Sequence, residues 1–406
     1  MSSNWNPGKP RLKPNLINLY VYLMLLRLYI SNFYSIADEV VLYFAAAGKK
    51  TCRQESHTLD FNGNRYVNII GLFGSNAAGK SNLIKAVNFF RNLVLTSTNN
   101  NEGFISGYEP FKFEMEKPSK LRLDFEWEGI EYEYSIEIYK DCIRSESLYH
   151  YPQKRRAKIF ERRDTDTYSF GKGLIQRPAE IEMSTGPQTL FLSRGNSMNR
   201  PVLKKVYRFF RDGMWVENGD YRIDSDSRKT IESHKSLLLK ALEISDSDII
   251  DFNIVESLPG IPVMQTFHRE NPNIPFDFIS EESEGTRRLF HILLMLIDKA
   301  QDDVTIFFDE FDLKLHLKLS EFILDVVSSF GKAQMVFTSH NPALLNRERL
   351  NDEQIVFVTK LPNGVSDFVP LYDYSGISKI KDLQKAYLQG RFDGVPYLGS
   401  VEEIKS

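Results

Sequence analysis

A glycine-rich segment of eight residues constrains the fold of this chain more than any other feature. Residues 74–81 read Gly-Ser-Asn-Ala-Ala-Gly-Lys-Ser and fit the pattern G-x-x-x-x-G-K-S. An apolar run over 66–73 precedes the segment, and a helix-like sequence over 82–91 follows it. A strand, a phosphate-binding loop and a helix in this order predict an α/β protein that binds ATP or GTP. The alternative is a glycine turn that only joins a strand to a helix.

The residue types of this loop predict the role of each position. Gly74 and Gly79 let backbone N–H groups close around a phosphate, and the Lys80 ammonium reaches the β and γ oxygens. The Ser81 hydroxyl is a ligand for Mg²⁺. We therefore expect a nucleoside triphosphate, ATP or GTP, bound together with Mg²⁺.

The overall charge does not favour a polyanionic partner. The 406 residues include 51 Lys plus Arg and 54 Asp plus Glu, which gives a net charge of −3. Any surface for nucleic acid or anionic lipid must therefore be local. The two cysteines, Cys52 and Cys142, are too few for a disulfide framework and lack metal-ligand spacing. We expect a cytoplasmic protein.

The beginning of the chain combines basic residues with an apolar run, as a secretory signal does. The run over 16–26 ends at Arg27, is too short to span a bilayer and passes into an alternating pattern over 28–36. We interpret this region as a strand and expect no membrane segment. Residues 1–23 are predicted to form a poorly ordered extension, and Met24 is an alternative to Met1 as the native start.

Periodicity divides the rest of the chain into four parts. The first is an N-terminal ATPase lobe over 24–184, in which strict alternation over 121–139 begins an antiparallel β-meander. A helical insertion is expected over 185–260, a second lobe over 261–372 and a helical tail over 373–406. The predicted fold class is α/β, with a mixed sheet, a meander and the helical insertion.

Polar residues follow two further apolar strands. The run over 304–308 ends in Asp309 and Glu310, which predicts a Walker B strand: Asp309 in the Mg²⁺ shell and Glu310 polarising the attacking water. A strand that ends in a solvated acidic turn is the alternative. The strand over 334–338 leads into His340, at the edge where parallel sheets bind ligands. We expect His340 to contact the γ-phosphate, although an isolated histidine is more often a packing residue.

A serine and a glycine precede a helix-like segment over 286–300. Ser283 and Gly285 place a hydroxyl and free N–H groups at a helix N-terminus, which suits an anion. An ordinary N-cap by Ser283 is the alternative.

In this order the motifs resemble those of the ABC-type ATPases of the SMC, RecF and OLD superfamily. The resemblance implies that the nucleotide is ATP, and that the signature loop of one protomer completes the nucleotide site of a second, in a head-to-tail dimer. It assigns Walker A, the signature, Walker B, the D-loop and the switch to these positions: Asn76, Gly79, Lys80, Ser81 and Asn82; Ser283 and Gly285; Asp309 and Glu310; Asp312; and His340.

A closer resemblance is to the RloA/AbiL type of bacterial phage-defence ATPase. It includes Gly285-Thr-Arg-Arg-Leu, Asp309-Glu-Phe-Asp, Thr338-Ser-His-Asn and the segment over 387–396. The chain departs from the family pattern at Lys314, where a small residue is usual, and offers no convincing Q-loop glutamine. It has no coiled-coil heptads, and residues 341–406 are too few for a Toprim nuclease. The resemblance thus implies an effector in trans, such as a Toprim-like or other nuclease.

The expected function is an ATP-hydrolysing head that forms a dimer or higher oligomer and acts as sensor and scaffold of an anti-phage complex. A nucleic acid or a phage protein would be the trigger. Two alternatives stay open: a RecF-like DNA-repair ATPase, and a non-catalytic scaffold that binds ATP. A basic cluster over 154–163 could follow a phosphate backbone, or form a solvated hairpin edge or a docking face.

Overall fold

The computed structural model describes residues 23–46, 57–100, 103–217, 225–245, 247–258, 261–299, 304–330 and 333–395. The extension predicted over 1–23 lies outside these ranges except for its last residue, and the tail predicted over 373–406 is described as far as residue 395.

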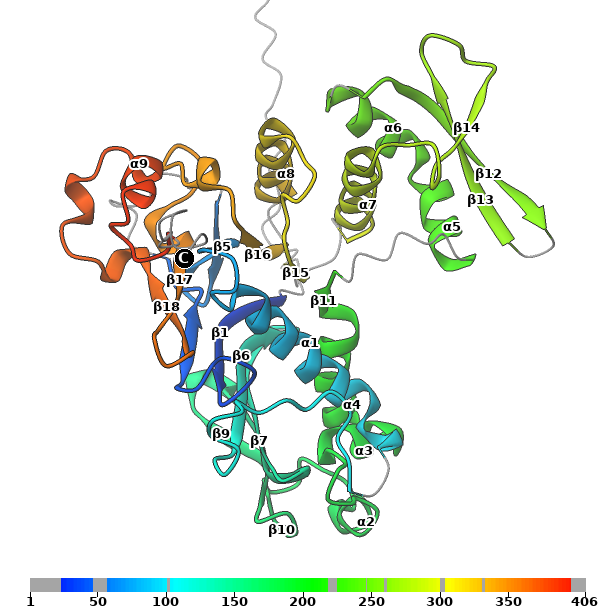
Figure 1. Ribbon diagram of the computed structural model, residues 1–406. Helices are drawn as coiled ribbons and strands as arrows, with labels where there is room; N and C mark the ends of the chain where they lie inside the picture. The colour runs from blue at the N-terminus through cyan, green and yellow to red at the C-terminus, as the bar shows by residue number, and fades with distance from the viewer. Residues whose placement is uncertain are drawn as a thin grey trace, which may run out of the picture.

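A six-stranded mixed sheet forms the centre of the molecule (Figure 1). Its strands, in spatial order, are β11 (Met214–Val216), β15 (Thr305–Phe308), β16 (Gln334–Ser339), β5 (Ile69–Phe73), β17 (Ile355–Lys360) and β18 (Ser366–Pro370). The first five pair in parallel, and β18 pairs antiparallel with β17. The apolar composition of β5, β15 and β16 matches their burial on both faces.

The alternation of side chains along β5 separates two hydrophobic cores. Ile70 and Leu72 point into the core shared with α1 (Lys80–Thr96) and with a large antiparallel sheet. Ile69 and Phe73 point into the other core, which the C-terminal helices cover. Those helices are α7 (Glu284–Lys299), α8 (Leu317–Phe330) and α9 (Leu383–Leu388).

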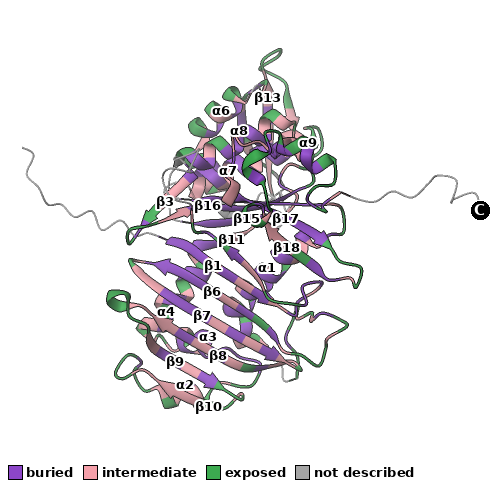
Figure 2. Ribbon diagram, turned by 90° about the vertical axis from the view of Figure 1, so that its left-hand side faces the viewer, coloured by how far each residue is buried: buried purple, intermediate pink, exposed green. Residues whose placement is uncertain are grey.

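The antiparallel sheet is the predicted meander, and Figure 2 shows its strands side by side. In spatial order they are β10 (Thr167–Phe170), β9 (Ala157–Arg163), β8 (Cys142–His150), β7 (Ile130–Tyr139), β6 (Ser119–Trp127), β1 (Leu23–Ser31) and β2 (Val40–Tyr43). Phe125 and Tyr134 are among the buried side chains that this sheet packs against α1. The predicted α/β fold with a mixed sheet and a meander is confirmed.

The remaining elements are short. The strands are β3 (Thr58–Phe61), β4 (Asn64–Val67), β12 (Ile249–Leu258), β13 (Ile261–His268) and β14 (Pro275–Asp277). The helices are α2 (Pro178–Met183), α3 (Phe191–Ser197), α4 (Pro201–Arg208), α5 (Ser225–Ser233) and α6 (Lys235–Ile244), with a π-turn at Phe209–Gly213. Single 3₁₀ turns occupy Ser97–Asn99, Pro152–Lys154, Pro342–Leu344, Asp352–Gln354, Leu371–Asp373 and Ile377–Lys379.

The structure corrects the helical insertion predicted over 185–260. Leu203 and Val206 of α4 belong to the core of the N-terminal lobe, whereas Leu238 and Leu242 of α6 belong to the other core. Between these helices β11 pairs with β15 as an edge strand of the central sheet, and β12 starts a separate three-stranded sheet. Helical periodicity revealed the helices but not the partners against which each one packs. The other predicted domain boundaries remain predictions.

Within the described ranges, no helix has both the length and the apolar character needed to cross a membrane.

Candidate nucleotide-binding site

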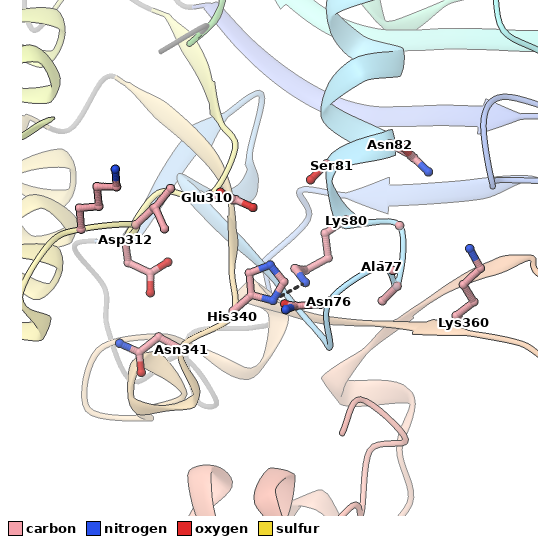
Figure 3. Close-up of a pocket in the computed structure, with 14 residues that line it drawn as sticks. Asn76, Ala77, Lys80, Ser81, Asn82, Glu310, Asp312, His340, Asn341 and Lys360 are labelled. Carbon is pink, nitrogen blue, oxygen red and sulfur yellow. Dashed lines mark hydrogen bonds between the residues drawn. The ribbon is translucent and has the colours of Figure 1, made fainter. Parts of the chain in front are cut away.

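A pocket of about 770 Å³ lies at the carboxyl ends of the central parallel strands (Figure 3). The loop after β5, the loop after β15 and the first residues after β16 meet there, because parallel strands end at the same edge of a sheet. The lining residues are Asn76, Ala77, Ala78, Gly79, Lys80, Ser81, Asn82, Glu310, Asp312, Leu313, Lys314, His340, Asn341 and Lys360. Eight residues predicted from the sequence therefore line one pocket, although they come from three distant segments.

The glycines of the loop are required by the conformation of the backbone. Gly79 is the N-cap of α1 and has a φ of 109°, a backbone conformation that residues with a side chain rarely adopt. A Cβ on Gly79 would overlap the hydroxyl of Ser366, and a Cβ on Gly74 would overlap the carbonyl oxygen of Val358. The loop thus lies directly against β17 and β18.

Lys80 is buried and satisfied by the loop itself. Its Nζ donates to the carbonyl oxygens of Gly74 (2.7 Å) and Ser75 (2.9 Å) and lies 3.1 Å from Nδ1 of His340. Burial lowers the pKa of Lys80 to about 8, although nearby Asp309 and other carboxylates raise it. Lys80 Nζ donates to carbonyl oxygens, and the carboxylates near it raise its pKa less than burial lowers it. A bound triphosphate would add negative charge beside this ammonium group.

His340 and Lys80 face each other across the pocket (Figure 3). Burial lowers the pKa of His340, and the positive charge of Lys80 lowers it further. In the neutral ring Nδ1 accepts from the Lys80 ammonium, so the proton lies on Nε2. His340 can then donate a hydrogen bond through Nε2 while Nδ1 accepts from Lys80.

A chain of hydrogen bonds fixes the carboxylate of Asp309, the residue predicted for Walker B. Ser81 Oγ donates to Asp309 Oδ1 (3.0 Å), and Thr338 Oγ1 donates to the same oxygen (2.7 Å). The backbone N–H of Glu310 donates to Thr338 Oγ1 (2.7 Å). A hydroxyl and a carboxylate oxygen side by side form an oxygen donor set of the kind Mg²⁺ prefers, so Ser81 and Asp309 fit this ion.

Sequence reasoning missed the residues that support the loop from behind. Ser366 Oγ donates to the carbonyl oxygen of Ala78 (2.6 Å) and lies 2.6 Å from Ser35 Oγ. Asn82 Nδ2 donates to Ser35 Oγ (2.7 Å). Ser35 and Ser366 are 331 residues apart, and neither stands in a local pattern that would have indicated its role.

Replacing Ser366 by alanine is expected to destabilise the protein by about 1–3 kcal/mol, because the buried carbonyl of Ala78 loses its donor. The free energy of unfolding from urea titrations measures this effect. The control is Ser328→Ala, since Ser328 is also buried but bonds only to the Leu324 carbonyl of its own helix. An equal loss in both variants would contradict a supporting role for Ser366.

The predicted signature residues lie outside this pocket. Ser283 is exposed, and its Oγ accepts from the backbone N–H of Thr286 (3.0 Å), as in an N-cap. A Cβ on Gly285 would lie 2.8 Å from the carbonyl oxygen of Lys314, a residue that does line the pocket. The side chain of Lys314 also pairs with Glu284. Lys314 therefore contacts the segment that contains the predicted signature residues within one protomer.

The basic cluster over 154–163 is paired with carboxylates only in part. Arg156 pairs with Glu133 (2.6 Å), and Arg163 and Lys158 pair with Glu161 (2.7 and 3.5 Å). Arg162 is buried, whereas Lys154 and Arg155 are exposed. Contact of this strand edge with a phosphate backbone stays a prediction.

Comparisons of structure return SMC head domains. One is from Thermotoga maritima (15% identity, TM-score 0.37, 85% of this chain and 98% of the other). A second is a Pyrococcus furiosus Smc head with an extended coiled coil, bound to the C-terminal domain of ScpA (12% identity, TM-score 0.42, 95% of this chain and 100% of the other). A third is a Pyrococcus yayanosii Smc head with a coiled coil and joint (10% identity, TM-score 0.44, 90% of this chain and 100% of the other). Among curated protein sequences, none matches this chain.

A protein-family model described as "AAA domain, putative AbiEii toxin, Type IV TA system" matches residues 69–346. The match spans more than half of the chain, from the strand before the phosphate-binding loop to beyond His340. The chain therefore belongs to this AAA family of P-loop ATPase domains.

Proposed function

We propose that this chain is an Mg²⁺-dependent ATP hydrolase of ABC type that forms a head-to-tail dimer and serves as sensor and scaffold of an anti-phage complex. The observation that carries the proposal is the single pocket that unites Lys80, Ser81, Glu310 and His340, with Asp309 bonded to Ser81. These are the groups that phosphoryl transfer to water requires: charge neutralisation, metal ligands and a carboxylate for the water.

Each side chain has a defined task in hydrolysis. Lys80 would exchange its carbonyl contacts for phosphate oxygens, while Ser81 and Asp309 would hold Mg²⁺. The bound ion would neutralise charge on the β and γ oxygens. Glu310 accepts a hydrogen bond from the attacking water, and His340 donates to the γ-phosphate through Nε2.

The position of the predicted signature supports the dimer. Ser283 is exposed and absent from the lining of its own pocket. In the proposed assembly Ser283 and Gly285 of one protomer close over the nucleotide of another. A higher oligomer built from such dimers is compatible with the same contact.

An effector in trans is the second part of the proposal. The family description links the AAA domain to a type IV toxin–antitoxin system, and an ATPase that works with an effector is compatible with this link. The effector is a Toprim-like or other nuclease, or a toxin, and the trigger is a nucleic acid or a phage protein. The resemblance to the RloA/AbiL type belongs to this proposal.

Purified chain is expected to hydrolyse ATP with Mg²⁺ and to stop when EDTA removes the metal. Affinity purification from the native host, followed by mass spectrometry, is expected to recover a nuclease or toxin with the chain. Recovery of no effector, combined with ATPase activity that DNA stimulates in the isolated protein, would contradict the defence role and favour a RecF-like repair ATPase.

A further inference from the structure

A buried arginine at the start of α7 connects the predicted signature to the Walker B segment. Arg288 Nη1 lies 3.0 Å from Glu217 Oε1, and the two side chains expose only 8% and 3% of their surface. Arg288 Nη2 donates to the backbone carbonyl oxygens of Asp309 (3.2 Å) and Glu310 (3.4 Å). One guanidinium group therefore contacts both the edge of the central sheet and the loop that carries Glu310.

Glu217 is itself fixed to β15, the strand that precedes Asp309. It follows β11, and its backbone N–H donates to the carbonyl oxygen of Phe307 in β15 (2.9 Å). His291, one turn further along α7, places Nε2 3.7 Å from the same Glu217 oxygen. The carboxylate thus holds the Arg288 guanidinium beside the end of β15.

Glu310 needs such support because its backbone conformation is unfavourable for any residue other than glycine. Its φ is 46°, in the left-handed region, and this conformation persists only where neighbours fix it. Thr338 accepts from the Glu310 N–H, and Arg288 donates to the Glu310 carbonyl. The two peptide groups that flank the Glu310 side chain are therefore held from opposite ends.

We propose that Arg288 is a positioning residue for hydrolysis that couples the signature helix to the orientation of Glu310. This inference rests on the proposed function. Gly285 lies three residues before Arg288 on α7, so both stand on the same side of the helix. When a second protomer engages Ser283 and Gly285, any shift of α7 acts on the Glu310 peptide through Arg288.

The chemistry of the site calls for arginine in particular. The contacts of the Arg288 side chain include one carboxylate oxygen and two carbonyl oxygens. A planar guanidinium group offers five N–H donors in a fixed fork, whereas a lysine ammonium offers a single point charge. Lysine could retain the ion pair with Glu217 but not all of the carbonyl contacts.

The test compares Glu217→Gln with the double variant Arg288→Gln/Glu217→Gln. The double variant removes the guanidinium without leaving a buried, unpaired carboxylate. We expect its kcat for ATP to be at least about tenfold below that of Glu217→Gln, as a loss of positioning would produce. The ATP KM and the Kd of a fluorescent ATP analogue should agree between the two variants. Arg288→Lys, with Glu217 intact, should show the same fall in kcat.

Hydrogen exchange gives a readout that does not depend on turnover. We expect faster exchange of the amides over 309–313 in both Arg288 variants, with the phosphate-binding loop unchanged. Equal kcat values for the two Gln variants, or a joint loss of kcat and nucleotide affinity, would overturn the positioning role. A wild-type chain that binds ATP without hydrolysing it would refute the proposed function, and the role of Arg288 in hydrolysis with it.

Discussion

Glu310→Gln protein is expected to bind ATP as the wild type does and to hydrolyse it at least about 100-fold more slowly, since a positioned general base contributes about 10²–10⁴-fold. The amide has nearly the shape of the carboxylate, and the backbone contacts of Glu310 to Thr338 and Arg288 do not involve the side chain. Lys80, Ser81 and Asp309 keep their contacts. Initial rates of phosphate release and the Kd of a fluorescent ATP analogue measure the two effects.

The same variant tests the dimer. Because hydrolysis would no longer separate the protomers, light scattering should report about twice the monomer mass with ATP and Mg²⁺, and the monomer mass without them. Glu243→Gln is the matched control, since it removes one carboxylate from an exposed position on α6. A mass for Glu310→Gln that ATP does not change would argue against dimerisation through the nucleotide. Turnover within tenfold of the wild type would show that another group activates the water.

The parts of the fold that the sequence predicted are those with local signals. The strand before the loop, the loop and α1 follow one another in the chain, and alternation over 121–139 indicates a hairpin without reference to distant residues. By contrast, β11 has three residues, too few for any periodicity. It is a strand because Trp215 and its neighbours pair with β15; the partner of Trp215 is Ile306, more than ninety residues later. A contact at that separation leaves no trace in a single sequence.

The candidate site also contains residues with a local sequence signal and residues whose role depends on distant contacts. Asp309, Glu310 and His340 were found because each follows an apolar strand, and parallel strands bring such positions together at one edge. Ser366 and Arg288 were not singled out as supporting residues, since an ordinary serine and one of two adjacent arginines acquire their roles only from distant partners. For Ser283 the sequence was compatible with two roles, an N-cap and a signature residue. The structure of one protomer shows the N-cap, whereas the proposed signature role requires a second protomer.

Gly79→Ala is expected to abolish nucleotide binding and to destabilise the protein by about 2–5 kcal/mol, the combined cost of a strained backbone and of overpacking. Gly79 has φ 109°, and a Cβ there would overlap the Ser366 hydroxyl and approach that of Ser35. The loop could relieve the overlap only by moving away from β18, which would displace the N–H groups and Lys80 from the phosphate position. The Kd for ATP should rise at least about 100-fold, equivalent to about 2.7 kcal/mol.

Gly129→Ala separates the effect of backbone strain from the effect of overpacking. Gly129 lies in the turn between β6 and β7 with φ 80°, and a Cβ there would meet nothing within 4 Å. This control therefore carries the backbone strain without the overlap, and it should cost about 1–2 kcal/mol while ATP binds normally. Urea titrations and the binding of a fluorescent ATP analogue give both quantities for both variants. If Gly79→Ala matched Gly129→Ala in stability and retained ATP affinity, the packing of the loop against Ser366 would not determine its function. A larger loss of stability together with a loss of binding would show that β18 holds the phosphate-binding loop in the conformation that receives the nucleotide.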